Sequence, residues 1–248
     1  MKPGEIYQLG RHRLACGNSS DAKLVSRLVG DDKIAMILCD PPYGVSYVES
    51  KRGIAKLATD KVIANDNIAD EPAYQAFTQE WLSVVKPYLS RKNSLYIFNS
   101  DKMLLPTIAA LKATAGKFAQ LLIWAKTHAV IGRLDYLPQH ELIIYGWYGT
   151  HVFAKSKDKS ILVYPRPNKS KLHPTMKPVG LLRRLILNSS QVGDTVFDGF
   201  VGSGSTLLAC EQTNRRCLAV ELDPAYCTVV ISRWEKLTGQ KAELIHES

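Results

Sequence analysis

The sequence predicts an α/β protein with a mostly parallel sheet and helices on both faces. Segments with strand character alternate with helical segments along nearly the whole chain, which is typical of this class. At 248 residues and 46% hydrophobic, the chain is long enough to bury one sizeable core. Charged residues make up 22% of it and no long low-complexity tract occurs, which favours an ordered protein. Because neither an internal repeat nor a linker is evident, we expect one domain over residues 1–248.

The first part of the chain predicts a hairpin followed by alternating helices and strands. The hairpin turns at Gly10, and Asp21 stands near the start of the next helix. Pro72 suits the first turn of a later helix, whose apolar residues recur every three or four positions. Residues 50–67 are polar and without a clear period, so we expect a loop there. The expected elements are the hairpin 5–16, helix 21–29, strand 33–40, helix 71–89, strand 94–100, helix 103–115 and strands 118–126 and 140–148.

The second part begins with a poorly patterned basic stretch at 150–175 and then returns to alternation. Pro178 suits the first turn of an amphipathic helix, and Gly239 is placed to close the last helix. The expected elements are helix 177–190, strand 194–200, helix 207–214, strand 216–222 and helix 224–239.

Charge and cysteine content narrow the class of protein. Lys and Arg number 32 against 23 acidic residues, and the net charge of +9 suits a polyanionic partner, although basic enzymes need not bind nucleic acid. Five cysteines without a CxxC pair argue against a disulfide framework and a zinc knuckle, so no metal is expected. The first residues lack the apolar core of a signal peptide, and no segment has the length of a membrane span. We therefore expect a cytoplasmic protein without membrane contact.

A glycine-rich loop after the strand 194–200 carries the first chemical signal. Gly202 and Gly204 let the backbone approach a ligand closely, and the next strand ends at Glu221, where an acid can accept hydrogen bonds from ribose hydroxyls. Asp198 would repel a pyrophosphate but attract a cation. The loop therefore indicates an adenosine-containing, positively charged cofactor such as S-adenosylmethionine. The alternative is an ordinary strand-to-helix turn with a surface glutamate.

The tetrapeptide "DPPY" at 40–43, at the end of the strand 33–40, carries the second chemical signal. The Asp40 carboxylate and the carbonyl of Pro41, fixed by the stiff backbone, are two acceptors for the N–H groups of an exocyclic amine. Tyr43 offers a face on which a base can stack. Acceptors outside the ring plane would localise the amine lone pair on nitrogen and direct it at a methyl donor. The alternative is a buried turn with a structural tyrosine.

Together these loops resemble the amino-group DNA methyltransferases, which methylate adenine N6 or cytosine N4 with S-adenosylmethionine. The matching segments are "DPPYG" at 40–44, "HPTMKP" at 173–178, "FDGFVGSGST" at 197–206 and "AVELDPAY" at 219–226. A catalytic motif before the cofactor motif is the order of the family's β group. The resemblance covers almost the whole chain. It implies a Rossmann-like methyltransferase fold, a single catalytic domain over 1–248, and short target-recognition loops near 46–64 and 149–172.

The resemblance also implies roles for individual residues. Those expected to hold the target base are Asp40, Pro41, Pro42 and Tyr43. Those expected to bind the cofactor are Asn18, Cys39, Asp40, His173, Thr175, Lys177, Phe197, Asp198, Gly199, Phe200, Gly202, Ser203, Gly204, Ser205, Thr206, Glu221 and Leu222. Within this set, Thr175 and Lys177 would close over the methionine end, although a lysine at a helix start can also face solvent. Relatives usually carry Asp where this chain has Asn18, so we expect weaker cofactor binding; Asp21 either substitutes or caps a helix.

A middle segment also resembles the family, in the region that helps to form the base pocket. The candidates for pocket or phosphate contacts are Lys126, Asp135, Tyr136 and His140. At the start of an apolar strand, His140 could equally be a core histidine. An amine inside a duplex is reached by base flipping, which costs about a few kcal/mol. The basic segments 51–61 and 155–171 could hold phosphates, or they could be solvated loops.

Several activities compete with adenine N6 methylation, the reaction that we expect. Cytosine N4 enzymes more often begin the catalytic motif with Ser than with an acid such as Asp40. Cytosine C5 chemistry needs a cysteine after proline, which is absent, and RNA or protein-glutamine methylation more often uses Asn at this position. A non-catalytic DNA-binding regulator has only Asn18 in its favour, and a nucleotide-dependent oxidoreductase is opposed by Asp198. The expected partner is double-stranded DNA in a bacterial or phage-infected cell; a homodimer and a cognate restriction endonuclease are left open.

Overall fold

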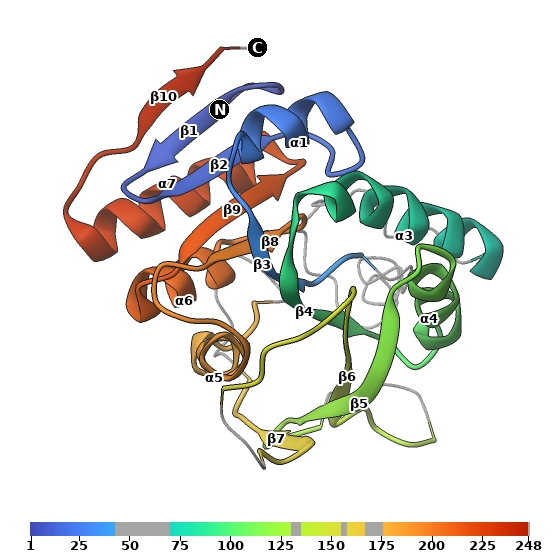
Figure 1. The fold of residues 1–248 in the computed structure, drawn as a ribbon. Coiled ribbons are helices and arrows are strands. Elements are labelled where there is room, and N and C mark those ends of the chain that lie inside the picture. Colours follow the sequence, from blue (N-terminus) through green and yellow to red (C-terminus); the bar gives the residue numbers. More distant parts are fainter. Residues whose placement is uncertain (43–69, 130–134, 155–157, 167–175, 248) are drawn as a thin grey trace.

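One mixed sheet of ten strands organises the protein (Figure 1). The computed structural model describes residues 1–42, 70–129, 135–154, 158–166 and 176–247. The strand order is β10-β1-β2-β9-β8-β3-β4-β6-β5-β7. The strands are β1 (Ile6–Leu9), β2 (His12–Cys16), β3 (Ile34–Cys39), β4 (Leu89–Asn99), β5 (Lys117–Ala125), β6 (His140–Trp147), β7 (Ile161–Val163), β8 (Thr195–Asp198), β9 (Arg216–Glu221) and β10 (Glu243–His246).

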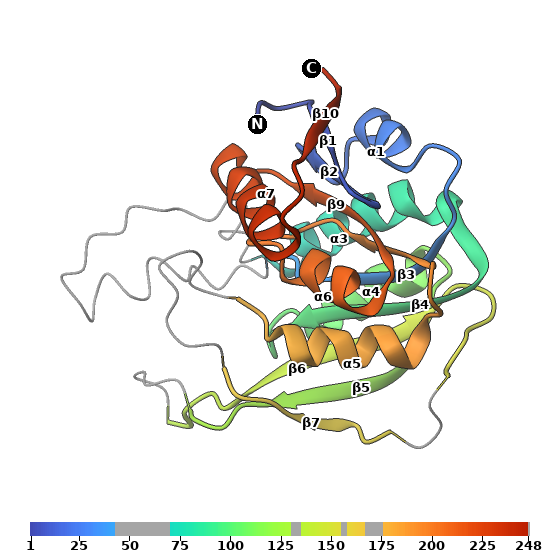
Figure 2. The ribbon, with the colours of Figure 1, turned by 90° about the vertical axis from the view of Figure 1, so that its left-hand side faces the viewer.

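Helices cover both faces of this sheet, as the alternation of strands and helices predicts (Figures 1 and 2). One face carries α1 (Ala22–Val29), α3 (Glu71–Val85) and α4 (Leu104–Ala113), with the 3-10 turn η1 (Lys86–Tyr88) after α3. The other face carries α5 (Val179–Ser189), α6 (Ser205–Thr213) and α7 (Pro224–Thr238). The predicted α/β architecture is therefore confirmed.

The central strands of the sheet are parallel, and the order in which the chain adds strands reverses at β3. β2, β9, β8, β3 and β4 pair in parallel. The chain leaves β3 for β4 on one side and returns later to β8 on the other, so β3 and β8 are adjacent although they are far apart in sequence. Ligands of open α/β sheets bind beyond the carboxyl ends of the strands at such a reversal.

The antiparallel strand β6 adds further side chains to the same edge. β6 is antiparallel to both β4 and β5, so β5 runs in the same direction as β4. The carboxyl end of β5 and the start of β6 therefore lie at the edge where β3 ends. Lys126, directly after β5, and Glu141, second in β6, are consequently close to this end of the sheet.

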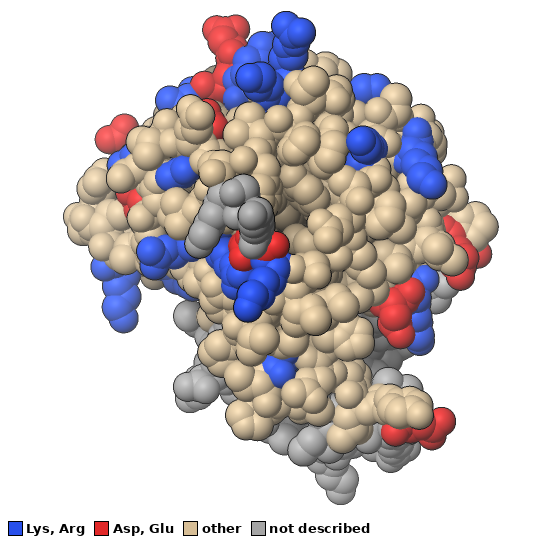
Figure 3. Space-filling view, turned by 60° about the horizontal axis from the view of Figure 1, so that its bottom comes forward, with Lys and Arg blue, Asp and Glu red and all other residues tan. Residues whose placement is uncertain are grey.

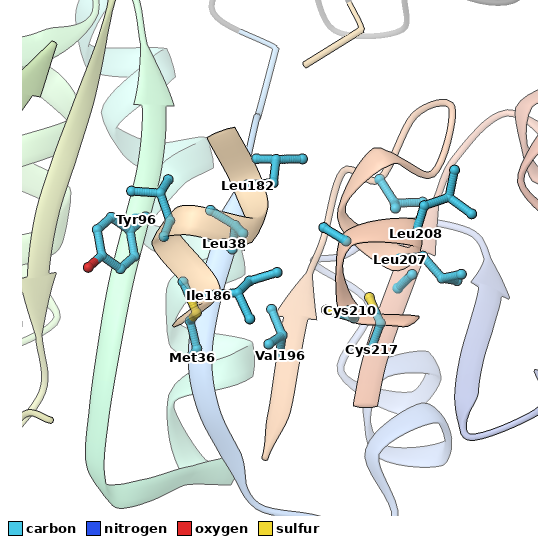
Figure 4. Packing of buried hydrophobic residues seen from close by; sticks show 14 of the residues in the cluster. Met36, Leu38, Tyr96, Leu182, Ile186, Val196, Leu207, Leu208, Cys210 and Cys217 are labelled. Atoms are coloured by element: carbon cyan, nitrogen blue, oxygen red, sulfur yellow. The ribbon is translucent and has the colours of Figure 1, made fainter. Parts of the chain in front are cut away.

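Two apolar layers hold the strands in place, one under each set of helices. Figure 4 shows part of one layer, in which Met36, Leu38 and Val196 of the strands lie near Leu182 and Ile186 of α5. A fully buried side chain of this size contributes about 1.5–3 kcal/mol relative to exposure. The close packing fixes the positions of the strand ends, and with them the loops that follow.

Local signals set several boundaries as predicted. The Asp21 carboxylate accepts the N–H groups of Lys23 and Leu24, so Asp21 caps α1. Gly239 ends α7 with φ of 73°, and its N–H donates to the Glu235 carbonyl. Of the two roles considered for Asp21, a cofactor contact and a helix cap, the helix cap is therefore confirmed.

Several features differ from the sequence-based expectation. α3 ends at Val85, four residues before the predicted end, and β4 begins at Leu89, five residues before the predicted start. β7 lies in the stretch that lacked a pattern, and β10 follows the last predicted helix. Both are short edge strands with exposed apolar residues, among them Ile161 and Val163 of β7, so neither sequence alternates between apolar and polar residues. The loop predicted at 50–67 lies outside the described residues. Among the described helices, each is too short or too polar to cross a bilayer.

Candidate active site

A cysteine joins the catalytic and glycine-rich loops. Cys39 is the last residue of β3, beside β8. Its thiol donates to the Phe197 carbonyl at 3.9 Å and accepts the Gly199 N–H at 3.3 Å. Burial raises the pKa of Cys39, so the thiol stays neutral. The contact holds Asp40, the next residue, against the loop that follows β8.

The glycine-rich loop is fixed by its own backbone and by the end of β9. The Phe200 N–H donates to the Asp198 carboxylate at 3.0 Å, and the Gly202 N–H donates to Glu221 Oε2 at 2.8 Å. Gly202 and Gly204 have positive φ values of 54° and 87°, which favour glycine. The two acids predicted for cofactor binding are thus tied directly to the loop between them.

These acids are unusual because they are buried. Asp198 is 2% exposed, and burial raises its pKa to about 7 against hydrogen bonds from Thr206 and the Phe200 N–H, with nearby acids adding to the rise. Burial likewise raises the pKa of Glu221 to about 7, against hydrogen bonds from the N–H groups of Asp223 and Gly202. The site therefore holds two carboxyl groups that a cationic ligand would return to the ionised form.

Hydroxyl groups around the same loop have no partner in the described part of the chain. They are the Oγ atoms of Ser19, Ser20 and Ser205, all buried. A side chain at Gly199 would place its Cβ 3.1 Å from Ser19 Cβ, so glycine keeps this approach open. Unpaired hydroxyls beside two acids suit a ligand with an ammonium group and several polar atoms. The residues present therefore fit S-adenosylmethionine.

On the other side of Asp40 lies a row of alternating charges. Lys177 donates to Asp40 Oδ2, and its Nζ is 3.2 Å from Glu141 Oε2. Lys126 Nζ is 2.8 Å from the other oxygen, Glu141 Oε1. Burial alone would lower the pKa of Lys177, but the carboxylates of Asp40 and Glu141 outweigh it and raise that pKa. Burial would raise the pKa of Glu141, but Lys177 and Lys126 outweigh it and lower that pKa.

Most of the predicted site residues converge on one edge of the sheet. Those brought together there are Asn18, Cys39, Asp40, Pro41, Pro42, Lys177, Phe197, Asp198, Gly199, Phe200, Gly202, Ser203, Gly204, Ser205, Thr206, Glu221 and Leu222. Tyr43, His173 and Thr175 lie outside the described residues.

Within this set, three residues are engaged with other parts of the chain. The Phe197 side chain is fully buried in the core, so its carbonyl rather than its ring faces the loop contacts. Thr206 interacts with Asp198. The Asn18 amide oxygen accepts the Ser20 N–H at 2.9 Å and is therefore engaged within the chain. Each of the three therefore helps to fix the loops, and whether it also contacts the cofactor stays a prediction.

The four middle-segment candidates also lie near this edge. Lys126 is in the row of charges, whereas Asp135 and His140 are exposed. The alternative that His140 is a core histidine is wrong, because the first residues of β6 are not buried and His140 is exposed. Tyr136 is 91% exposed. Whether these side chains contact DNA stays a prediction.

Sequence reasoning missed Glu141 and Arg233. Arg233 of α7 donates to the Ser203 carbonyl and, at 3.1 Å, to Ser203 Oγ, so it holds the glycine-rich loop from behind. Glu141 is a single acid at the start of an apolar strand, and Arg233 is one of several charges on an amphipathic helix. Neither position carries a signal without knowledge of which strands and helices are neighbours.

The mixed, mostly parallel sheet, the glycine-rich loop with its buried acids and the adjacent Asp-Pro-Pro define a methyltransferase that uses S-adenosylmethionine. A family model described as DNA methylase, of the N6/N4 type, matches residues 34–232, and the chain belongs to this family. It is therefore an S-adenosylmethionine-dependent methyltransferase that acts on an amino group of DNA.

Relatives and solved structures agree with this assignment. The chain is 26% identical to the type II methyltransferase M.HpaI of Haemophilus parainfluenzae, over 89% of this chain and 73% of that protein. It is 24% identical to M2.DpnII of Streptococcus pneumoniae, over 91% of each.

Two solved structures show the same fold at lower identity. The cytosine-N4-specific PvuII DNA methyltransferase superposes with a TM-score of 0.72 at 16% identity, over 96% of this chain and 93% of that one. The complex of M1.HpyAVI with its cofactor superposes with a TM-score of 0.67 at 19% identity, over 89% and 97%.

Proposed function

We propose that the protein transfers a methyl group to adenine N6 in duplex DNA. The observation that carries the proposal is the placement of Asp40 directly beside the cofactor loop, through the contacts of Cys39 with Gly199 and Phe197. The choice of adenine over cytosine rests on the acid at position 40, where cytosine N4 enzymes more often have Ser. Cytosine N4 remains the alternative, since the same pair of acceptors would hold its amine.

Each part of the site has a role in the proposal. Asp40 and the Pro41 carbonyl accept the two amine hydrogens and localise the nitrogen lone pair, while Pro42 stiffens the turn and Tyr43 stacks on the base. S-adenosylmethionine supplies the electrophilic methyl group when bound. The amine proton then leaves through Asp40 to solvent.

The cofactor-facing residues would act on different parts of the ligand. Glu221 accepts the ribose hydroxyls, and Asp198 faces the positively charged part. Phe200, Gly202 and Ser203 line the adenosine and methionine. Polar atoms left unpaired in the described part of the chain, such as Ser19 Oγ, support this arrangement.

The DNA partner follows from the family, and the manner of binding is part of the proposal. We propose base flipping into a site on one catalytic domain over 1–248, with the β-group order of motifs and with recognition loops near 46–64 and 149–172. Figure 3 shows basic side chains spread among uncharged surface on the side where β7 lies, rather than one continuous band. The basic segments 51–61 and 155–171, largely outside the described residues, would then supply phosphate contacts.

The cellular setting is also proposed from the relatives. The relatives M.HpaI, M2.MboI of Moraxella bovis and M2.DpnII are named type II methyltransferases, which are enzymes of restriction–modification systems. We therefore propose a bacterial cytoplasmic enzyme paired with a cognate restriction endonuclease, and a homodimer as a further state to test.

The test is transfer of labelled methyl from S-adenosylmethionine to unmethylated duplex DNA, followed by nucleoside analysis. We expect N6-methyladenine; N4-methylcytosine would overturn the base assignment. Asp40→Ala should lower transfer at least roughly 100-fold while cofactor binding is retained, because one acceptor of the amine is lost. Asp31→Ala, at an exposed acid before β3, is the matched control. A well-folded wild type that transfers no methyl to any unmethylated DNA would favour a non-catalytic regulator.

A further inference from the structure

Three charged side chains from three other segments meet beside Asp40, and with it they form a row of alternating charges. Lys126 follows β5, Glu141 belongs to β6, Lys177 precedes α5, and Asp40 follows β3. Glu141 contacts both lysines, at 2.8 Å and 3.2 Å, and Lys177 contacts Asp40. The row is therefore continuous from Lys126 to the acid proposed to hold the target amine.

The two lysines of the row are buried, where an ionised ammonium group costs free energy unless it is paired. Lys177 and Lys126 are each 7% exposed, and an ammonium taken out of water is stable only when it is paired and hydrogen-bonded. The Phe98 ring lies 5.1 Å from Lys177 Nζ and covers another side of it. Glu141, whose side chain is 22% exposed, thus provides one of the carboxylates that allow Lys177 to stay charged at this depth.

We infer that Glu141 is a positioning residue for methyl transfer, and that it acts on Asp40 through Lys177. Lys177 engages Asp40 Oδ2 and so restrains the rotation of the carboxylate that receives the amine. Glu141 holds the same ammonium from the other side. The inference rests on the proposed role of Asp40 but not on which amine is methylated. It assigns Lys177 to the target amine, whereas the resemblance implies a place at the methionine end of the cofactor.

The charge of the amine during transfer explains why a second acid is needed. As the methyl group arrives, the amine nitrogen becomes positive, and Asp40 stabilises that charge. A lysine beside it would oppose the same charge if it were uncompensated. Glu141 offsets Lys177, so the pair can orient Asp40 without adding a net positive charge next to the reacting nitrogen. Lys126, which contacts Glu141 on the far side, balances the row.

The first experiment is a double-mutant cycle on Glu141 and Lys177. Glu141→Gln and Lys177→Met are each expected to lower kcat for methyl transfer roughly 10- to 100-fold, since small displacements of a catalytic group cost about this much. The double variant should be no slower than Lys177→Met alone, because Glu141 acts only through Lys177. KM for DNA and the calorimetric Kd for S-adenosylmethionine should stay within about twofold.

Two further variants separate positioning from general loss of stability. Glu141→Gln with Lys126→Met removes one charge of each sign, so it keeps the net charge of the row. If Glu141→Gln alone unfolds, this double variant still tests whether loss of the Glu141 carboxylate lowers kcat. Glu235→Gln is the matched control, because it breaks a surface pair with Lys241 far from the row. It should leave kcat unchanged.

Any of three results would overturn the inference. The first is a kcat for Glu141→Gln within about twofold of wild type, and the second is effects of Glu141→Gln and Lys177→Met that multiply in the double variant. The third is a Lys177→Met enzyme that loses cofactor affinity at unchanged kcat, which would return Lys177 to the cofactor.

Failure of the proposed function gives a different result. Methylation of cytosine N4 would change the base assignment and leave the cycle intact. If wild type methylates nothing, the carbon-13 NMR shift of the Asp40 carboxyl should still respond to Glu141→Gln and not to Glu235→Gln. An unchanged shift would contradict the inference even then.

Discussion

At the scale of single residues, Asp198 and Glu221 are carboxyl groups held in a buried place before any cofactor arrives. Burial raises the pKa of each to about 7, well above that of an exposed acid. A carboxyl group whose pKa is raised on folding contributes stability that is present below its unfolded pKa and is lost as pH rises through about 7. As pH rises from the unfolded pKa of these groups to about 7, the cofactor-free protein therefore loses stability. A cation that binds beside the two carboxylates restores it.

This has a consequence for cofactor affinity. Between about pH 6 and about pH 7.5 both acids lose their protons, while an α-amino group, with an ordinary pKa of about 7.7–8.0, stays largely charged. Because the ionised acids attract the cofactor, we expect its calorimetric Kd to fall roughly tenfold over this range. Glu221→Gln should bind more weakly and with a smaller dependence on pH. A Kd for wild type that is constant over the range would show that the two acids do not face the charged ligand.

At the scale of elements, the site is made by strand ends, and the helices behind them fix the loops. β3, β8 and β9 end side by side and deliver Asp40, Asp198 and Glu221 to one edge. α7 then reaches back to the glycine-rich loop through Arg233, which contacts Ser203 twice. A helix that makes no contact with the reacting atoms thereby shapes the cofactor site.

Loss of this contact should loosen the loop. Arg233→Met removes a charge-assisted hydrogen bond to the loop, and such bonds contribute about 1.5–3 kcal/mol. Because Arg233 is only half-buried, we take the low end and expect cofactor binding to weaken about tenfold. Arg183→Met, at an exposed arginine of α5, should leave binding unchanged. The role assigned to Arg233 fails if both variants bind the cofactor as wild type does.

At the scale of the whole molecule, the sequence predicts what is encoded locally. The mostly parallel sheet, the cap at Gly239 and the acids Asp40 and Glu221 at strand ends all follow from short patterns. Glu141 was not predicted because its role depends on contacts between distant segments. β6 lies antiparallel beside β4, and Lys177, far away in sequence, contacts Glu141. The edge strands β7 and β10 were not predicted because they are short and most of their apolar residues are exposed, as Ile161 and Val163 are in β7.

The final prediction concerns the packing that holds the site together. Leu185 and Leu187 both lie on α5, the helix that follows Lys177, but Leu185 is 1% exposed and Leu187 is 47% exposed. Leu185→Ala leaves a cavity between α5 and the sheet, so we expect it to lower the free energy of unfolding by about 2–5 kcal/mol. Leu187→Ala, the matched control, should cost less than about 0.5 kcal/mol, because its side chain is largely in water.

Urea unfolding followed by circular dichroism and by tryptophan fluorescence measures both changes. If one core unites the two helical layers, the two signals should give coincident transitions for wild type and for each variant. Equal costs for the two leucines would show that α5 is not held on the sheet by this face. Separate transitions would mean that α5 and its layer unfold on their own, and then the position of Lys177 against Asp40 would depend on a locally stable part of the chain rather than on the whole fold.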